Sequence, residues 1–192
     1  MQEILILIEV EIKLPIHRRS SIERGLTTLG FIPGDLIRES DSYFTSDSHD
    51  FMKTDEALRI RESENFTKAC ITTLLTYKGP KLDDVSMTRK ELETEIGNAD
   101  ICCEILYSLG YHKLSPVVKL RQYYHQDNVT ACVDQVEKLG SFLELEIIVE
   151  RESERENALK KIEAILNDLD CSMAETTRYS YLFMLQKENR TC

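Results

Sequence analysis

Apolar and charged positions alternate along much of the chain and predict β-strands that have one apolar and one charged face. From Ile4 to Leu14 every even position is apolar, whereas the odd positions end in Glu9, Glu11 and Lys13. A period of two residues places these two sets on opposite faces of a strand. The same alternation returns at residues 58–61, 72–78, 89–93, 118–121 and 143–147. We expect about eight strands in all.

Three segments change to the helical period, at residues 20–30, 98–110 and 153–170. The first begins at Ser20, with Glu23 three residues later as in a capping box, and stops at Gly30. The second begins near Asn98 and carries on one side Ile101, Ile105 and Leu109. The third opens at Ser153 and directs inward Leu159, Ile162, Leu166 and Leu169. We expect these amphipathic helices to cover the apolar faces of the strands.

A shift of 80 positions aligns two parts of the chain and predicts an internal duplication. It places Glu11 on Glu91, and Leu29-Gly30-Phe31 on Leu109-Gly110-Tyr111. A strand with acidic residues, a helix and a Leu-Gly-aromatic exit therefore occur twice.

Length and charge restrict the class of protein. The 192 residues, 42% of them hydrophobic, predict a single domain over residues 1–192. The formal net charge is −10, so nucleic acid and anionic membranes are not expected as partners. The longest apolar run, Ile4 to Ile8, is far shorter than the roughly 20 residues that span a bilayer. The six cysteines lack a C-x-x-C spacing, which favours reduced thiols in a cytoplasmic protein over a zinc site.

The charged strand faces are the most informative feature. On an open sheet such a charged face would simply be the solvent-exposed face. Because several strands share the pattern and three helices are available to cover the apolar faces, we expect the charges on the inner side of a curved sheet. The predicted fold is α+β, an eight-stranded antiparallel β-barrel with helices packed outside. The lumen of a barrel of about eight strands is filled by side chains or holds one small ligand.

The charges expected inside the barrel balance. Seven cations would point inward: Lys13, Arg59, Arg61, Lys78, Arg89, Lys119 and Arg121. Seven anions would face them: Glu9, Glu11, Glu91, Glu93, Asp134, Glu144 and Glu146. A bare anion would be repelled by these carboxylates, so the carboxylates need another role. Glu-x-Glu on a strand puts two carboxylates about 7 Å apart on one face, and hard divalent cations take such ligands. Metal and cations together describe a polyphosphate site.

Short motifs throughout the chain resemble those of the CYTH superfamily, the triphosphate tunnel metalloenzymes. Glu9-Val10-Glu11-Ile12-Lys13 looks like the Glu-x-Glu-x-Lys signature of that superfamily. Further matching segments follow in order at residues 42–44, 57–61, 77–80, 89–93, 109–112, 119–121, 134–136, 139–146 and 180–182. The resemblance implies an antiparallel tunnel that binds a triphosphate lengthwise.

The resemblance also implies roles for individual residues. Divalent metals, Mg²⁺ or Mn²⁺, would be bound by Glu9, Glu11, Glu144 and Glu146. The phosphates would be held by Lys13, Arg59, Arg61, Lys78, Lys119 and Arg121. Arg89 would add a substrate contact, Arg178 would close one end of the tunnel, and Asp134 would join the catalytic set. The alternative for each residue is a structural ion pair, and this alternative is strongest for Arg89, Glu91, Glu93 and Asp134.

Three functions stay open at this point. Lys78-Gly79-Pro80, Leu109-Gly110-Tyr111-His112 and Ser180-Tyr181 look most like the class IV adenylyl cyclases, which convert ATP to cyclic AMP and pyrophosphate. Phe183 departs from related sequences, which usually have an acidic residue there. A triphosphatase acting on inorganic tripolyphosphate, thiamine triphosphate or a nucleoside triphosphate is the second function. A non-catalytic nucleotide or polyphosphate sensor is the third, and both Glu-x-Glu pairs argue against it. The sequence leaves a homodimer open.

Overall fold

The computed structural model describes residues 8–82 and 87–189, so the predicted strand positions before Ile8 lie outside the described residues. Nine strands run in chain order as β1 (Ile8–Ile16), β2 (Ile32–Thr45), β3 (Ala57–Asn65), β4 (Cys70–Lys81), β5 (Arg89–Glu95), β6 (His112–Lys113), β7 (Val117–Gln126), β8 (Val129–Val136) and β9 (Gly140–Val149). Helices are α1 (Arg19–Thr28), α2 (Ala99–Ser108), α3 (Arg155–Asp168) and α4 (Tyr181–Asn189), with short 3₁₀ turns at Glu152–Glu154 and Met173–Glu175.

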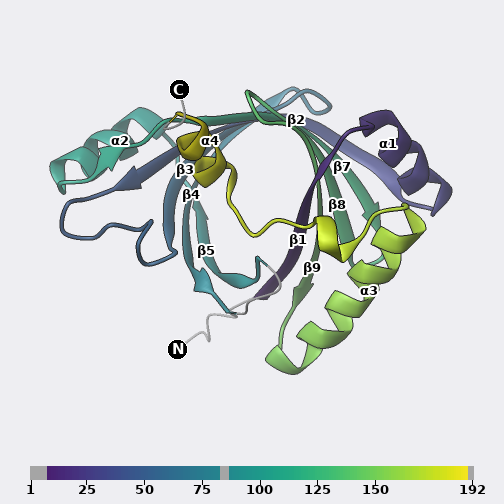
Figure 1. Cartoon of the computed structure of the whole chain (residues 1–192). Helices are drawn as coiled ribbons and strands as arrows, with labels where there is room; N and C mark the ends of the chain where they lie inside the picture. The colour runs from purple at the N-terminus through teal and green to yellow at the C-terminus, as the bar shows by residue number, and fades with distance from the viewer. Residues whose placement is uncertain (1–7, 83–86, 190–192) are drawn as a thin grey trace.

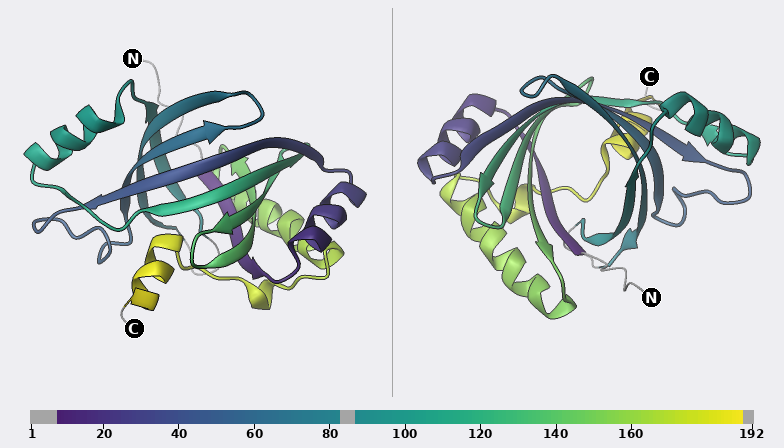
Figure 2. Two further views of the ribbon diagram at one scale, coloured as in Figure 1. Left: turned by 90° about the horizontal axis from the view of Figure 1, so that it is seen from above. Right: turned by 180° about the vertical axis from the view of Figure 1, so that it is seen from behind.

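Eight of the strands close into an antiparallel barrel, which confirms the predicted fold class. Their order is β3-β4-β5-β1-β9-β8-β7-β2, and β2 pairs again with β3 to complete the ring. The short β6 pairs with the end of β2 outside this ring. Figures 1 and 2 show the helices on the outside of the barrel, with α1 and α3 on one side, α2 on the other and α4 near one opening.

The outer surface of the barrel carries the main apolar core. Val10, Ile12 and Leu14 of β1 are almost fully buried and belong to one cluster with α1 and α3. The α3 side chains Ile162 and Leu166 are inaccessible to solvent within that cluster, as the helical period predicts. Because the apolar face of β1 points outward under these helices, its charged face must point into the barrel. Among the described residues, no helix has the length and apolar character needed to cross a membrane.

The start of α1 differs from the prediction. The helix begins at Arg19, and the preceding Arg18 provides no side-chain cap. Glu23 does not complete a capping box with Ser20, because its carboxylate lies 2.8 Å from the Arg19 guanidinium one turn earlier. A salt bridge between residues i and i+4 on the helix surface thus replaces the predicted cap.

The orientation of α2 also corrects the sequence analysis. Asn98 caps the helix by accepting a hydrogen bond from the Ile101 backbone N–H at 2.9 Å. The predicted apolar side is exposed, at 61% for Ile101, 53% for Ile105 and 69% for Leu109. The barrel instead contacts the neighbouring face, through Cys102, Cys103 and Leu106. Both faces of α2 are apolar, so periodicity alone could not decide which of them packs.

The barrel has the internal symmetry that the predicted duplication requires. Exchanging β1 with β5, β2 with β7, β3 with β8 and β4 with β9 leaves every pairing of the ring unchanged. The two helix exits match as well, because the Phe31 N–H donates to the Leu26 carbonyl at 3.0 Å and the Tyr111 N–H to the Leu106 carbonyl at 2.9 Å. Gly30 and Gly110 adopt positive φ angles of 93° and 87° at these exits. Glycine adopts this conformation without the steric cost of a Cβ atom.

We expect Leu166→Ala to lower the free energy of unfolding by about 2–5 kcal/mol, because it leaves a cavity under α3. Ile105→Ala, at an exposed helical position, should cost less than about 1 kcal/mol. Urea unfolding followed by circular dichroism measures both changes. Equal effects would contradict the assignment of the core to the α3 side of the barrel.

Candidate functional site

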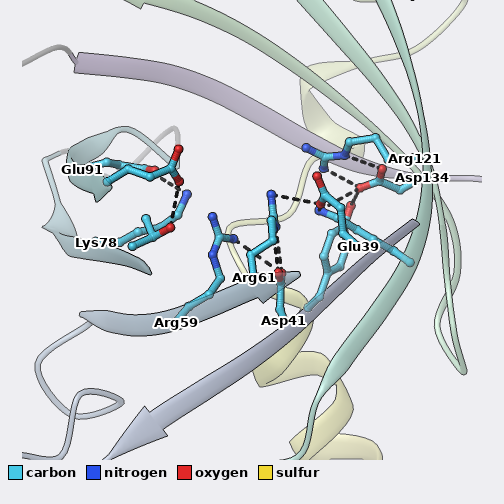
Figure 3. A network of polar contacts seen from close by, with 12 residues as sticks. Glu39, Asp41, Arg59, Arg61, Lys78, Glu91, Arg121 and Asp134 are labelled. Carbon is cyan, nitrogen blue, oxygen red and sulfur yellow. Dashed lines mark hydrogen bonds and ion pairs between the residues drawn. The ribbon is translucent and has the colours of Figure 1, made fainter. Parts of the chain in front are cut away.

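A cavity of about 740 Å³ lies inside the barrel and collects nearly all the predicted site residues. They come from six strands and from the segment before α4: Glu9, Glu11, Lys13, Arg59, Arg61, Lys78, Arg89, Lys119, Arg121, Glu144, Glu146 and Arg178. Of the predicted set, Asp134 does not line the cavity and is fully buried behind it. Figure 3 shows the polar network that several of these side chains form.

The first half of this network centres on two acidic residues of β2 that the sequence analysis missed. The Arg61 guanidinium donates to both Asp41 carboxylate oxygens, at 2.6 and 2.8 Å. Glu39 lies 3.0 Å from Arg61 and 3.1 Å from the Lys119 ammonium group. Asp41 and Glu39 are 1% and 2% exposed. These cations hold the pKa of Glu39 at about 2 and the pKa of Asp41 below its usual range, although burial acts in the opposite direction.

The spacing of Glu39 and Asp41 could have identified them as residues that face the barrel interior. They stand two residues apart, like Glu9 and Glu11, and therefore share one face of a strand. The polar sequence Glu39-Ser40-Asp41-Ser42 hides this alternation, because its outward face lacks the apolar residues that mark the other strands.

The second half of the network holds Arg121 and repeats the geometry of the first. Arg121 donates to both carboxylate oxygens of Asp134, at 2.7 and 2.6 Å, and also contacts Glu144. The Tyr181 hydroxyl donates to Asp134 at 2.9 Å, and Lys119 lies 3.6 Å from the same carboxylate. Asp134 therefore fixes the position of Arg121 from behind the cavity wall.

Lys13 lies beside this cluster. Its ammonium group is 2.9 Å from Glu144 and 3.3 Å from Glu11, and both carboxylates raise the pKa of Lys13 against the effect of burial. It also lies 4.4 Å from the centre of the Tyr181 ring. The predicted metal ligand Glu144 thus forms ion pairs with basic side chains of the protein, which hold its pKa well below its usual range.

A third group of charges lies on β4 and β5. Lys78 contacts Glu91, and its ammonium group is 3.8 Å from Glu9. Burial is the largest influence on the pKa of Glu91 and raises it, but the attraction of Lys78 and Arg59 and the hydrogen bonds with Lys78 and Glu9 together lower this pKa below its usual value. Arg89 is 3.6 Å from the carboxylate of Asp55 and donates to the backbone carbonyl of that residue at 3.3 Å. Lys78 and Arg89 thus form ion pairs, as expected if their role is structural and not only to bind substrate.

The charge balance inside the barrel differs from the prediction. Glu39 and Asp41 add two buried carboxylates to the seven expected, and the cavity lining also includes Asp55 and Glu56 and the cations Lys81 and Arg178. Among the described residues, eleven carboxylates thus stand against nine cations. The excess is expressed at Glu9, Glu11 and Glu146, whose pKa values are all raised by burial. For Glu146 burial and the neighbouring Glu9 carboxylate raise the pKa to about 9. Glu11 is buried and Glu9 and Glu146 are half-buried, so these three carboxyl groups resist ionisation and lie where a further positive charge would stabilise them.

The donor chemistry of these residues fits a hard divalent cation. Carboxylate oxygens are the ligands that Mg²⁺ and Mn²⁺ prefer, and Glu11 and Glu146 are directly paired on β1 and β9. Within residues 8–82 and 87–189, however, no three His, Cys, Asp or Glu side chains already form a metal-ion site. The ion pairs of Glu144 are one reason, because they hold its carboxylate against Lys13 and Arg121 and away from a shared metal site.

Comparison with known proteins matches residues 7–181 to the family model described as the CYTH domain. A Methanocaldococcus jannaschii protein named as a putative adenylate cyclase is 38% identical over 177 residues, which cover 92% of this chain and 97% of that protein. The solved structure of a Pyrococcus horikoshii protein is 37% identical and covers 94% of this chain and 99% of its own, with a TM-score of 0.86.

A third similarity concerns the fold alone. A Hippeastrum protein, described as a putative adenylyl cyclase with a dominant triphosphatase activity, is 16% identical. It covers 96% of each chain with a TM-score of 0.65.

Acid titration should reveal the contribution of Glu39 to stability. Its folded pKa of about 2 lies below the ordinary value of 4.5, so this contribution is complete above about pH 5 and disappears as the pH falls toward 2. Glu39→Gln should lower the free energy of unfolding at pH 7 by about 2–4 kcal/mol and flatten its decrease with acid. Urea unfolding at pH 7, 5 and 3 measures this, with the exposed Glu163→Gln as control. Parallel pH profiles for Glu39→Gln and the wild type would contradict the assignment.

Proposed function

This chain belongs to the CYTH domain family, and we propose that its tunnel binds the triphosphate of ATP and converts ATP to cyclic AMP and pyrophosphate. Members of this family are adenylyl cyclases or triphosphatases that use divalent metals and triphosphate substrates. The cyclase proposal rests on the motifs of the class IV branch, and the name of the Methanocaldococcus relative agrees with it.

One observation carries the triphosphate assignment. Arg59 is 7% exposed in the wall of the cavity, and its Nε has no hydrogen-bond partner among the described residues. Its nearest carboxylate contact, to Asp41, is loose at 3.5 Å. Leaving such a donor buried and unpaired costs about 1–3 kcal/mol. A phosphate oxygen is an acceptor that a guanidinium group binds well, and several other cations line the same cavity.

The remaining cations have complementary roles in this proposal. Arg59 and Arg61 on β3 and Lys119 and Arg121 on β7 would hold phosphate oxygens from different sides of the cavity. Asp134 would act as a positioning residue, because it fixes Arg121 and accepts from Tyr181. Arg61 and Arg121 are each anchored to a carboxylate by two hydrogen bonds and are therefore preorganised for ligand binding.

Glu9, Glu11 and Glu146 would hold the divalent cation, and Glu144 would join them if its present ion pairs opened. A bound Mg²⁺ or Mn²⁺ would neutralise phosphate charge and polarise a phosphoryl oxygen. In the cyclase reaction the ribose 3′-oxygen forms a bond to the α-phosphorus while the bond from that phosphorus to the bridging oxygen breaks. Pyrophosphate leaves and the hydroxyl proton is released. The chain's contribution is to orient the phosphates and stabilise their charge.

A triphosphatase reaction is the second candidate, and the Hippeastrum protein of the same fold motivates it. Water would then attack the terminal phosphorus, and orthophosphate and a diphosphate would form. Incubation with ATP, inorganic tripolyphosphate or thiamine triphosphate, with Mg²⁺, Mn²⁺ or EDTA, separates the two reactions. Cyclic AMP with pyrophosphate supports the cyclase. Orthophosphate with a diphosphate supports the triphosphatase, and tight binding without any product would favour a sensor.

The double variant Glu9→Gln/Glu11→Gln should lose essentially all turnover and keep its fold, because amides cannot supply the charge that a divalent cation needs. Product formation and circular dichroism are the two measurements. Full activity of the double variant would remove both residues from the metal site.

Arg59→Ala and Lys119→Ala should each raise KM and lower kcat, because each removes a positive charge from the cavity wall. In each variant the two changes should reduce kcat/KM by about a hundredfold or more. Initial rates over a range of substrate concentrations give both constants. Lys90→Ala is the matched control, since Lys90 is exposed on β5 and is absent from the cavity lining. Wild-type kinetics for Arg59→Ala and Lys119→Ala would exclude these residues from the site.

A further inference from the structure

An aromatic pair lies in the cavity wall at the start of α4. The rings of Tyr179 and Phe183 stack with their centroids 4.7 Å apart and their planes 15° apart. Both residues line the cavity, yet they remain 53% and 37% exposed. The Lys187 ammonium group lies 6.0 Å from the Tyr179 ring centre. Exposed large aromatic residues in a cavity are unusual for packing and typical of ligand contact.

The attachment of α4 to the barrel does not depend on Phe183. Tyr181, Leu182 and Leu185 are 5–7% exposed and pack with residues of β7, β8 and β9. Tyr181 also donates its hydroxyl hydrogen bond to Asp134. Because these neighbours hold the helix in place, the stacked pair is left free for another role.

The pair lines the same cavity as Lys13 and Lys119, two of the cations proposed to bind phosphate. The ring of Tyr181 is 4.4 Å from the Lys13 ammonium group and 5.3 Å from that of Lys119. Tyr181 stands two residues from both Tyr179 and Phe183. Because all four side chains line one cavity, a ligand whose phosphates reach Lys13 and Lys119 can extend its other end toward the aromatic pair.

We propose that Phe183, supported by Tyr179, is a stacking platform for the nucleobase of a nucleoside triphosphate. Every base has a π face, so an aromatic ring binds it by stacking without reading its hydrogen-bonding edge. The platform would give this chain a preference for nucleoside triphosphates over inorganic tripolyphosphate. This inference rests on the proposed triphosphate site and adds the part of the substrate that the charged residues do not contact.

Two matched ligands test the platform without turnover. They are the ATP analogue with methylene groups in both phosphate bridges and the corresponding inorganic triphosphonate, each titrated calorimetrically with Mg²⁺. Phe183→Ala should weaken binding of the nucleotide analogue about tenfold and leave binding of the inorganic one unchanged. Phe66→Ala should change neither affinity, because Phe66 is 49% exposed and does not line the cavity.

Phe183→Trp supplies a readout that a structural role would not give. The chain has no tryptophan, so this variant has a single indole. The nucleotide analogue should bind it with near wild-type affinity and change its emission, whereas the inorganic analogue should leave the emission unchanged. If Phe183→Ala does not fold, Tyr179→Ala tests the same pair from outside the helix.

The outcomes separate the platform from the triphosphate site. Equal losses of affinity for the two ligands, or no loss for either, would overturn the platform. If the wild-type protein binds the inorganic analogue but not the nucleotide analogue, the platform is also overturned, whereas the triphosphate site stands. If the wild type binds neither ligand, the proposed function itself fails.

Discussion

Pairing of buried charges inside a closed barrel is the constraint on which this structure depends. Charges removed from water are tolerated only with partners, and the two doubly hydrogen-bonded pairs here join adjacent strands. Asp41 pairs with Arg61 across β2 and β3, and Arg121 with Asp134 across β7 and β8. A slip of one residue in either pairing would turn a strand's charges outward, into the apolar layer beneath the helices. Charge pairing and the outer core therefore specify the same register.

The two halves of the barrel carry related positions with opposite charge. Glu39 and Asp41 on β2 stand 80 residues before Lys119 and Arg121 on β7, which is the offset of the duplicated motifs. Glu39 and Lys119 are direct register partners where β2 and β7 meet. Across the same pseudo-symmetry, Arg61 takes the place of Asp134 as the partner on the next strand. The duplicated framework can thus close on itself because acid in one half meets base in the other.

The pairing is incomplete at two points, and both point to a ligand. The buried Nε of Arg59 has no acceptor within the described part of the chain, and Glu9, Glu11 and Glu146 have raised pKa values. A triphosphate would satisfy the first need and a divalent cation the second. Ligand binding and the stability of the barrel interior therefore depend on the same set of buried charges.

The sequence by itself determined the parts of this protein that follow local rules. Period-two alternation identified charged inner faces, helical spacing identified the buried side of α3, and short motifs identified most of the charged residues of the cavity, although not Asp41, Asp55, Glu56 or Lys81. Tertiary structure alone decided the partners. It showed that Glu39 and Asp41 complete the network, that Glu144 bonds cations, and that Asp134 lies behind the wall. It also chose which apolar face of α2 packs and placed Phe183 in the cavity. These outcomes depend on strands far apart in the chain, and only closure of the ring brings those strands together.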